Sequence, residues 1–148
     1  MTVAVVEVAV ATTYSLRRSV LRADDPAADV AFAQDGRPGA WHLAALDGDE
    51  VVGVLSTAPA GTPWRPERPA AQLRGMAVAF DRQGTGIGSA LLDAACTRLR
   101  GEGVAVVWAN ARDTALAFYE HHGFTVVGEG FVTADTGLPH HVIMLDLA

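Results

Sequence analysis

A glycine-rich turn between a predicted strand and a predicted helix constrains the fold of this chain more than any other feature. The turn has the sequence Arg82-Gln83-Gly84-Thr85-Gly86-Ile87-Gly88-Ser89. Its alternate glycines let the backbone fold tightly and point successive N–H groups the same way. The helix that follows adds the positive end of its dipole. We interpret the turn as a cradle for a phosphate or pyrophosphate; the alternative is an ordinary strand–helix turn whose glycines allow close packing.

The segments around the turn alternate between strand and helix patterns. Residues 72–80 are typical of a strand, and residues 86–100 of a helix with one apolar face. Residues 104–108 form a continuous apolar run, which indicates a strand buried on both faces. The remaining expected elements are strands over 2–10, 41–46, 51–57, 124–127 and 141–147, helices over 14–22, 26–33 and 114–122, and a proline-rich loop over 59–69. This order predicts one domain over residues 1–148 of the α/β (α+β layered) class, with helices packed on a mixed sheet.

Composition and charge argue against several kinds of partner. The chain has 148 residues and a net charge of −6, which disfavours a nucleic acid or an anionic membrane as its main partner. Its single cysteine, Cys96, excludes an internal disulfide and a zinc site built on several thiolates, and we expect no metal. The apolar start of the chain has no basic region, and no segment reaches the length of a membrane span. We therefore expect a cytoplasmic location.

The basic residues narrow the choice of phosphate ligand. All 11 are arginine, so the chain contains no lysine. This excludes a Walker-type phosphate loop, a Schiff-base lysine and a kinase-type ATP lysine. A dinucleotide fold would need a third glycine at Ser89 and an acidic residue after the next strand, where this chain has Asn110. An oxidoreductase that binds NADH is therefore disfavoured.

Two motifs together resemble the GNAT superfamily, the Gcn5-related acyl-CoA-dependent N-acyltransferases. The family turn [Gln/Arg]-x-x-Gly-x-[Gly/Ala] is similar to residues 83–88, which follow a strand ending in Met76-Ala77-Val78. A family block Ala-x-x-[Leu/Phe]-Tyr-x-x-x-Gly-Phe is similar to residues 115–124, ALAFYEHHGF. The chain departs from the family at Phe80, where many members have proline, and at Arg112, where many have asparagine. Asn110 is the alternative to that asparagine. Residues 137–140, GLPH, are similar to a poorly characterised bacterial subgroup.

The resemblance implies a fold and a coenzyme site. The expected fold is a mixed, mostly antiparallel sheet of about seven strands, with helices on both faces and a V-shaped splay between strands 4 and 5. Acetyl-CoA is the implied co-substrate, with its pyrophosphate on the glycine-rich turn and its pantetheine arm against the backbone near Met76 and Val78. A backbone N–H there would polarise the thioester carbonyl. The full set of expected coenzyme-binding residues is Met76, Ala77, Val78, Arg82, Gln83, Gly84, Thr85, Gly86, Ile87, Gly88, Ser89, Asn110, Arg112 and Phe118.

The resemblance also implies roles for acid and base. Tyr119 matches the family tyrosine that protonates the departing thiolate, and an ordinary phenol is protonated at pH 7. Periodicity alone favours a packed core residue instead. Glu129 and His140 are the candidate bases, and histidine has a suitable pKa. His42 and His141 are further candidates; a solvated side chain, or a water chain as base, are the alternatives.

The acceptor is less constrained than the coenzyme. We expect a primary amine of a small molecule; the alternatives are a protein or peptide amine, or a non-catalytic acyl-CoA-binding sensor. Arg17, Arg18 and Arg22 on the first helix can bind a substrate anion, although a solvated helix face is favoured. Arg74 either lines the cleft or pairs with an acid, and Trp64 is either a lid or a packing residue. A homodimer is possible, and we expect neither a nucleic-acid nor a membrane partner.

Overall fold

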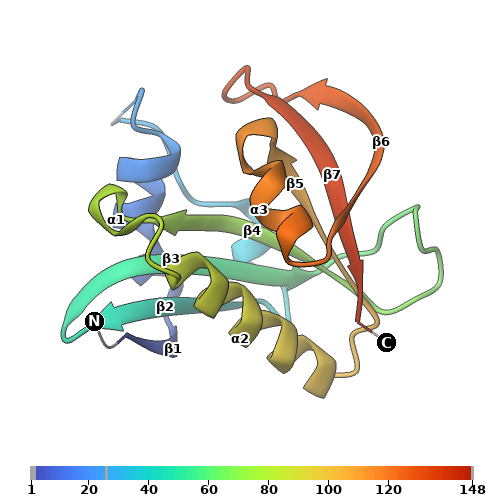
Figure 1. Ribbon diagram of the computed structural model, residues 1–148, viewed down its shortest axis with the longest axis horizontal. Helices are drawn as coiled ribbons and strands as arrows, with labels where there is room; N and C mark the ends of the chain where they lie inside the picture. Colours follow the sequence, from blue (N-terminus) through green and yellow to red (C-terminus); the bar gives the residue numbers. More distant parts are fainter. Residues whose placement is uncertain (1–2, 26, 148) are drawn as a thin grey trace. The chain divides into compact units, whose positions relative to one another are not determined.

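The computed structural model describes residues 3–25 and 27–147, and its strands follow the expected order (Figure 1). Residues Met1, Thr2, Pro26 and Ala148, to which the expected first strand, second helix and domain limits extend, lie outside the described residues. The strands are β1 (Ala4–Val8), β2 (Trp41–Asp47), β3 (Glu50–Pro59), β4 (Ala70–Val78), β5 (Val106–Arg112), β6 (Thr125–Val132) and β7 (Pro139–Asp146). The helices are α1 (Tyr14–Leu16), α2 (Ile87–Gly101) and α3 (Leu116–His121), with shorter helical segments η1 (Val10–Thr13), η2 (Arg17–Leu21), η3 (Ala33–Gly36), η4 (Phe80–Arg82) and η5 (Asp113–Ala115).

The strands form one sheet in the order β1-β2-β3-β4-β5-β7-β6. β2 pairs antiparallel with β1 and β3, and β7 pairs antiparallel with β5 and β6, whereas β4 and β5 are parallel. The expected seven-stranded, mostly antiparallel mixed sheet is therefore confirmed. The β4–β5 ladder joins residues 70–72 to residues 106–108, which is the start of each strand. A ladder that ends so early is what a splay requires, and the splay itself stays a prediction.

The chain divides into two compact units. The first contains the residues up to Pro59 together with Leu73–Arg98, and the second contains Ala60–Gln72 together with the residues from Leu99 onward. Each unit is described by itself below. The glycine-rich turn belongs to the first unit, and Tyr119 with the candidate bases Glu129 and His140 belongs to the second.

Helices cover both faces of the sheet in the first unit. Successive residues of a strand face opposite sides. A Cβ on Gly53 of β3 would lie 2.7 Å from the Ile87 side chain of α2. The next residue, Val54, packs with Leu16 of α1 and Ala77 of β4. The glycine at 53 therefore lets α2 approach one face closely, while α1 seals the other.

The second unit has its own core. Val106, at the start of β5, is fully buried and packs with Ala105 and Met144, as the apolar run in the sequence predicts. On the same strand, Val107 is also fully buried. Leu145 of β7 lies beneath Gly123, the residue after α3 where the chain turns into β6. Within the described residues, no helix is both long and apolar enough to span a membrane.

The helical predictions before β2 are partly wrong. The expected helix over 14–22 forms as one α-helical turn, α1, followed by the π-helical turn η2, in which the Arg22 N–H bonds the Arg17 carbonyl; the 3-10 turn η1 precedes it. The expected helix over 26–33 does not form in its described part, which is irregular and is followed by η3. Asp25 and Asp29 accept hydrogen bonds from backbone N–H groups two residues ahead. Such local bonds compete with helix formation.

The later boundaries shift by a few residues. η5 forms the first turn of the helix expected over 114–122. β6 continues to Val132, beyond the expected end at Val127, through a register shift between Val127 and Phe131. β7 begins two residues early, at Pro139. Both His140 and His141 therefore lie within β7, close to its start, as expected.

Candidate active site

The glycine-rich turn has a backbone that other residues rarely adopt. Gly84 has φ 78° and Gly86 has φ 90°, both in the left-handed region that favours glycine. A Cβ at either position would meet nothing within 4 Å. Close packing therefore does not explain why glycine is present at these positions. The left-handed backbone of the turn does. The turn leads directly into α2, a helix of 15 residues that begins at Ile87.

Side chains of the turn hold it in place. The Gln83 side-chain amide donates to the Val78 carbonyl at 3.1 Å, which fastens the turn to the end of β4. The Thr85 hydroxyl donates to the Arg82 carbonyl. Arg82 itself is engaged with acidic groups, since its guanidinium lies 2.7 Å from Asp47 and 3.3 Å from Glu50. The hydrogen bond to Asp47 raises the pKa of Arg82, so its charge is shared with the β2–β3 hairpin before any anion binds.

Tyr119 is a core residue by its contacts. It is 7% exposed and packs edge-on against the rings of Phe118 and Phe124, with ring centroids 5.2 Å and 5.4 Å away. Burial raises the pKa of its phenol to about 12. Among the described residues, no hydrogen-bond partner of its hydroxyl is found. Tyr119 therefore stays protonated at neutral pH with its proton uncommitted, as a proton donor requires.

The two candidate bases differ in environment. Glu129 is exposed and lies between two glycines in the bulged part of β6. His140 is buried, stacks on Phe131, and has its Nδ1 2.8 Å from the Leu138 carbonyl. A carbonyl can only accept, so Nδ1 carries the proton and Nε2 is left as the basic nitrogen.

The sequence did not reveal a histidine–carboxylate pair. His141 Nδ1 lies 2.6 Å from an Asp113 carboxylate oxygen, and both side chains are partly exposed. A Cβ on Gly130 would lie 2.9 Å from His141 Nε2, so the bulge in β6 leaves room for the ring. His42, the remaining candidate, is buried against Ser56, and burial lowers its pKa. His42 therefore stays neutral inside the first unit.

The other expected coenzyme residues of the second unit follow β5. Asn110 pairs with Val142 and Arg112 with His140 across the β5–β7 ladder. Because they are two residues apart, Asn110 and Arg112 share one face of the strand. Phe118 of α3 is half-buried, with its ring 4.7 Å from that of His122. Neither Asn110 nor Arg112 is fully buried.

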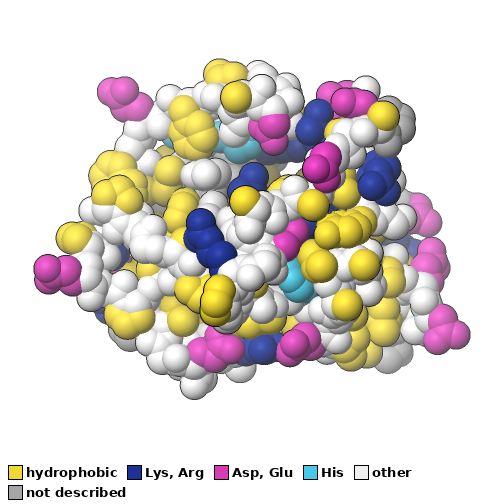
Figure 2. All heavy atoms as spheres, turned by 180° about the vertical axis from the view of Figure 1, so that it is seen from behind, with side chains coloured by type: hydrophobic (Ala, Val, Ile, Leu, Met, Phe, Trp, Pro, Cys, Tyr) yellow, Lys and Arg dark blue, Asp and Glu magenta, His cyan; other side chains and the backbone are white. Residues whose placement is uncertain are grey.

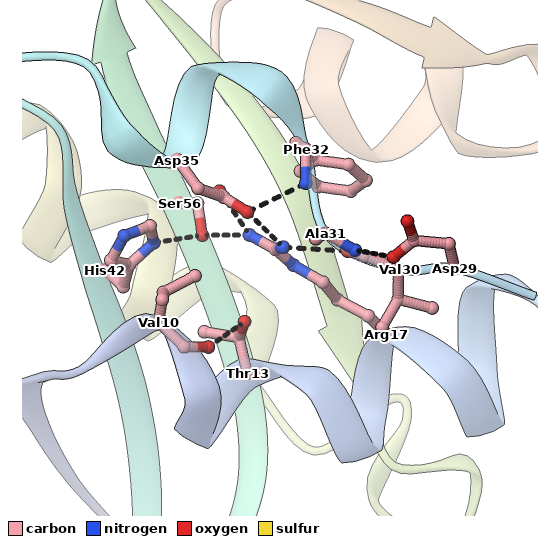
Figure 3. Close-up of polar contacts among 10 residues, drawn as sticks. All are labelled: Val10, Thr13, Arg17, Asp29, Val30, Ala31, Phe32, Asp35, His42 and Ser56. Carbon is pink, nitrogen blue, oxygen red and sulfur yellow. Dashed lines mark hydrogen bonds and ion pairs between the residues drawn. The ribbon is translucent and has the colours of Figure 1, made fainter.

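Arg17 corrects the expectation of a solvated helix face. Its side chain is fully buried and donates to the Val30 carbonyl at 2.9 Å, to Ser56 Oγ at 2.8 Å and to both oxygens of Asp35 (Figure 3). Burial alone would raise the pKa of Asp35, but the hydrogen bonds from Arg17 and from the Phe32 N–H hold it below its usual value. Arg18 is exposed as expected, and Arg22 lies 3.8 Å from Asp24 and Asp25.

Trp64 packs the proline-rich loop rather than standing free. It is 43% exposed, and a Cβ on Gly128 would lie 2.7 Å from its ring. Gly128 has φ 74° in the β6 bulge. Arg65 fixes the same loop through two 3.0 Å contacts with Asp146 of β7. Trp64 and Arg65 therefore hold this loop against β6 and β7 of the same unit.

Comparisons with known proteins agree with this geometry. A family model described as "Acetyltransferase (GNAT) family" matches residues 9–124. A search of curated proteins found no match. Among solved structures, FeeM, an N-acyl amino acid synthase from uncultured soil microbes, is 16% identical with a TM-score of 0.84, covering 99% of this chain and 91% of that one.

Two further solved structures are named for different acceptors. An aminoglycoside 6'-N-acetyltransferase complexed with coenzyme A is 17% identical with a TM-score of 0.74, covering 98% of this chain and 97% of that one. The ribosomal-protein-S18-alanine N-acetyltransferase of Escherichia coli is 19% identical with a TM-score of 0.74, covering 99% and 95%. At these identities the likeness shows the fold alone.

Proposed function

The chain belongs to the acetyltransferase (GNAT) family, and from that premise we propose that it moves the acetyl group of acetyl-CoA to a primary amine of a small molecule. The amine attacks directly while both substrates are bound. The observation that carries the proposal is the turn at Gly84 and Gly86, whose left-handed backbone has no packing explanation and which leads into the N-terminus of α2. A helix start behind such a turn is a favourable place for a pyrophosphate.

The coenzyme contacts are proposed unit by unit. In the first unit, residues 82–89 hold the pyrophosphate, and backbone groups of residues 76–78 pair with the pantetheine arm. In the second unit, Asn110, Arg112 and Phe118 contact the coenzyme. Because the Val78 carbonyl already accepts a hydrogen bond from the Gln83 side chain, we expect the pantetheine arm to pair with other backbone groups of residues 76–78. We expect Arg82 to contribute little charge, since Asp47 and Glu50 already neutralise it.

The proton transfers follow from the environments of the side chains. Acetyl-CoA supplies the activated acyl group. A backbone N–H near Met76 or Val78 stabilises the charge that develops on the acyl oxygen. Tyr119, which burial keeps protonated at neutral pH, donates its proton to the departing sulfur. Glu129 or His140 takes the proton that the amine loses. In His140 the proton of the ring is on Nδ1, so Nε2 has a lone pair that can accept another.

The relatives do not select the acceptor, because their names cover an amino acid product, an aminoglycoside and a ribosomal protein. A protein or peptide amine and a non-catalytic sensor therefore stay as alternatives. The cytoplasmic location, the homodimer and the single domain over 1–148 also stay predictions. No group of three or more potential metal ligands is found in the described part of the chain, and the proposed reaction uses none.

The test is an amine screen that detects thiol release from acetyl-CoA. We expect turnover with a subset of primary amines, and loss of at least tenfold in kcat/KM for acetyl-CoA in Gly86→Ala, since alanine is strained at φ 90°. Gly101→Ala is the matched control, because its position is also open but lacks a left-handed φ. Equal activity of the two variants would remove the turn from the coenzyme site. Coenzyme binding without turnover on any amine would favour the sensor.

A further inference from the structure

The Phe32 ring lies beside the strand segment assigned to the acetyl group, and two guanidinium groups pack over it. The Cζ of Arg17 is 3.9 Å and the Cζ of Arg74 is 4.3 Å from the ring centroid. Phe32 is half-buried, in the irregular segment before η3. All three residues belong to the first unit. Their arrangement is a cationic side chain resting on an aromatic ring, which orients a guanidinium without neutralising it.

Gly75 brings this cluster to the reacting strand. It has φ 66°, and a Cβ there would lie 2.8 Å from the Phe32 ring and 3.0 Å from Arg17 Nε. The ring therefore contacts the backbone one residue before Met76, where the thioester is proposed to bind. Any substrate group that touches Phe32 or Arg74 is close to that point along β4.

The two arginines differ in how their charge is used. Arg17 is fully buried and bonded to both oxygens of Asp35, so its charge is neutralised within the fold. Asp35 also accepts the Phe32 N–H at 2.8 Å. Figure 3 shows the Arg17 guanidinium bonded to Asp35, which in turn is bonded to the backbone of Phe32. The Arg17–Asp35 pair thus holds the backbone of Phe32 in position through the Asp35 carboxylate.

Arg74, in contrast, keeps an uncompensated charge. It is exposed, and no carboxylate among the described residues pairs with it. The acidic residues of the segment near Phe32 are engaged elsewhere: Asp24 and Asp25 with Arg22, Asp29 with a backbone N–H, and Asp35 with Arg17. Acidic and basic side chains are interspersed on the face shown in Figure 2, and the chain has a net charge of −6.

We propose that Arg74, held on the Phe32 ring, binds a carboxylate of the acceptor, so that the acceptor is an amine of the amino-acid type. The proposal rests on the proposed acetyl transfer and names its substrate class. A guanidinium presents parallel N–H donors that match a carboxylate. Arg17 is a positioning residue: it touches Phe32 and not the substrate.

The test pairs each acceptor with a neutral analogue of nearly the same size. Glycine, alanine and phenylalanine are compared with their amides, in turnover and in binding to the CoA-loaded protein by calorimetry. The variants are wild type, Arg74→Gln and Arg100→Gln, which alters another exposed arginine, on α2. We expect the wild type to prefer at least one acid over its amide by about tenfold, the usual scale of a charge-assisted bond. Arg74→Gln should abolish that preference, and Arg100→Gln should keep it.

Several results would overturn the proposal. Equal affinity of the wild type for each acid and its amide would do so, with or without turnover, because binding is measured independently of catalysis. Equal losses for acids and amides in Arg74→Gln would do so too. Failure of the protein to bind CoA at all would instead reject the proposed function. The two failures are therefore distinguishable.

The role of Phe32 has its own test. Phe32→Leu keeps an apolar residue and leaves the Arg17–Asp35 pair intact. We expect it to raise KM for the acid acceptor several-fold without changing KM for acetyl-CoA, because it removes the ring beneath Arg74. A parallel rise in both constants would indicate a general loss of structure and contradict the assigned role.

Discussion

Removal of the Asp35 charge tests the buried electrostatic centre of the first unit. Asp35→Asn preserves the shape of the side chain but leaves the guanidinium of Arg17 buried without a counter-charge. Arg17 is 0% exposed, and the Asp35 side chain is 8% exposed. Breaking such a buried pair typically costs about 3–5 kcal/mol. That is a large part of the roughly 5–15 kcal/mol by which a domain is stable.

The same chain offers a control of similar geometry. Arg65 contacts both oxygens of Asp146 at 3.0 Å, but both side chains are more than a third exposed. Exposed pairs contribute little because water screens them. Asp146→Asn should therefore change stability only slightly. Urea unfolding at pH 7 measures both variants, and a shift of less than about 1 kcal/mol for Asp35→Asn would refute the reasoning.

Acid titration gives a second measure of the same pair. Burial raises the pKa of Asp35, but the hydrogen bonds from Arg17 and Phe32 outweigh it and hold the pKa below the ordinary 3.8. The folded state thus binds this proton less readily than the unfolded state. The stabilisation is present above about pH 3.8 and is lost as pH falls through the lower folded pKa. Wild type should therefore lose more stability than Asp35→Asn between pH 5 and pH 2, about the acid range in which paired carboxylates titrate.

Three further predictions concern catalysis and packing. Tyr119→Phe should lower kcat at least tenfold and leave CoA affinity and stability nearly unchanged, since no hydrogen bond of its hydroxyl is found in the described structure; kcat within twofold of wild type would contradict the acid role. His140→Gln should lower kcat roughly a hundredfold, whereas an unchanged kcat, with the loss found in His141→Gln instead, would transfer the role to the Asp113–His141 pair. Gly53→Ala should destabilise the protein by about 1–3 kcal/mol in urea, because its Cβ would lie 2.7 Å from Ile87 and 2.9 Å from Leu91; unchanged stability would show that α2 shifts freely.

The sequence predicted the parts of the fold that rest on local patterns. The apolar run at residues 104–108 and the glycine-rich turn each carry their signal within a few residues, and the strands and α2 were placed nearly correctly. The turn residues 47–50, which join the strands expected over 41–46 and 51–57, are likewise a local hairpin signal, and β2 and β3 pair antiparallel through them. Boundaries moved where a bulge intervened, as in β6.

Long-range polar contacts were not predictable in the same way. Arg17 and Arg18 are adjacent arginines in one helical segment, yet one is fully buried and the other exposed. What separates them is Asp35, which lies 18 residues away across an irregular segment. The Asp113–His141 pair spans 28 residues and forms only because β5 and β7 are neighbours in the sheet. No local pattern in the sequence carries either pairing.

Coenzyme binding is the claim on which the rest depends, and thermal unfolding with acetyl-CoA, CoA or NADH tests it most directly. Ligand at about 100 times its dissociation constant should stabilise the fold by ~2.7 kcal/mol, a shift of several degrees for a domain of this size. We expect that shift with acetyl-CoA and with CoA, no shift with NADH, and loss of the shift in Gly86→Ala but not in Gly101→Ala. Stabilisation by NADH alone, or by none of the three, would contradict the assignment of the turn and with it the proposed reaction.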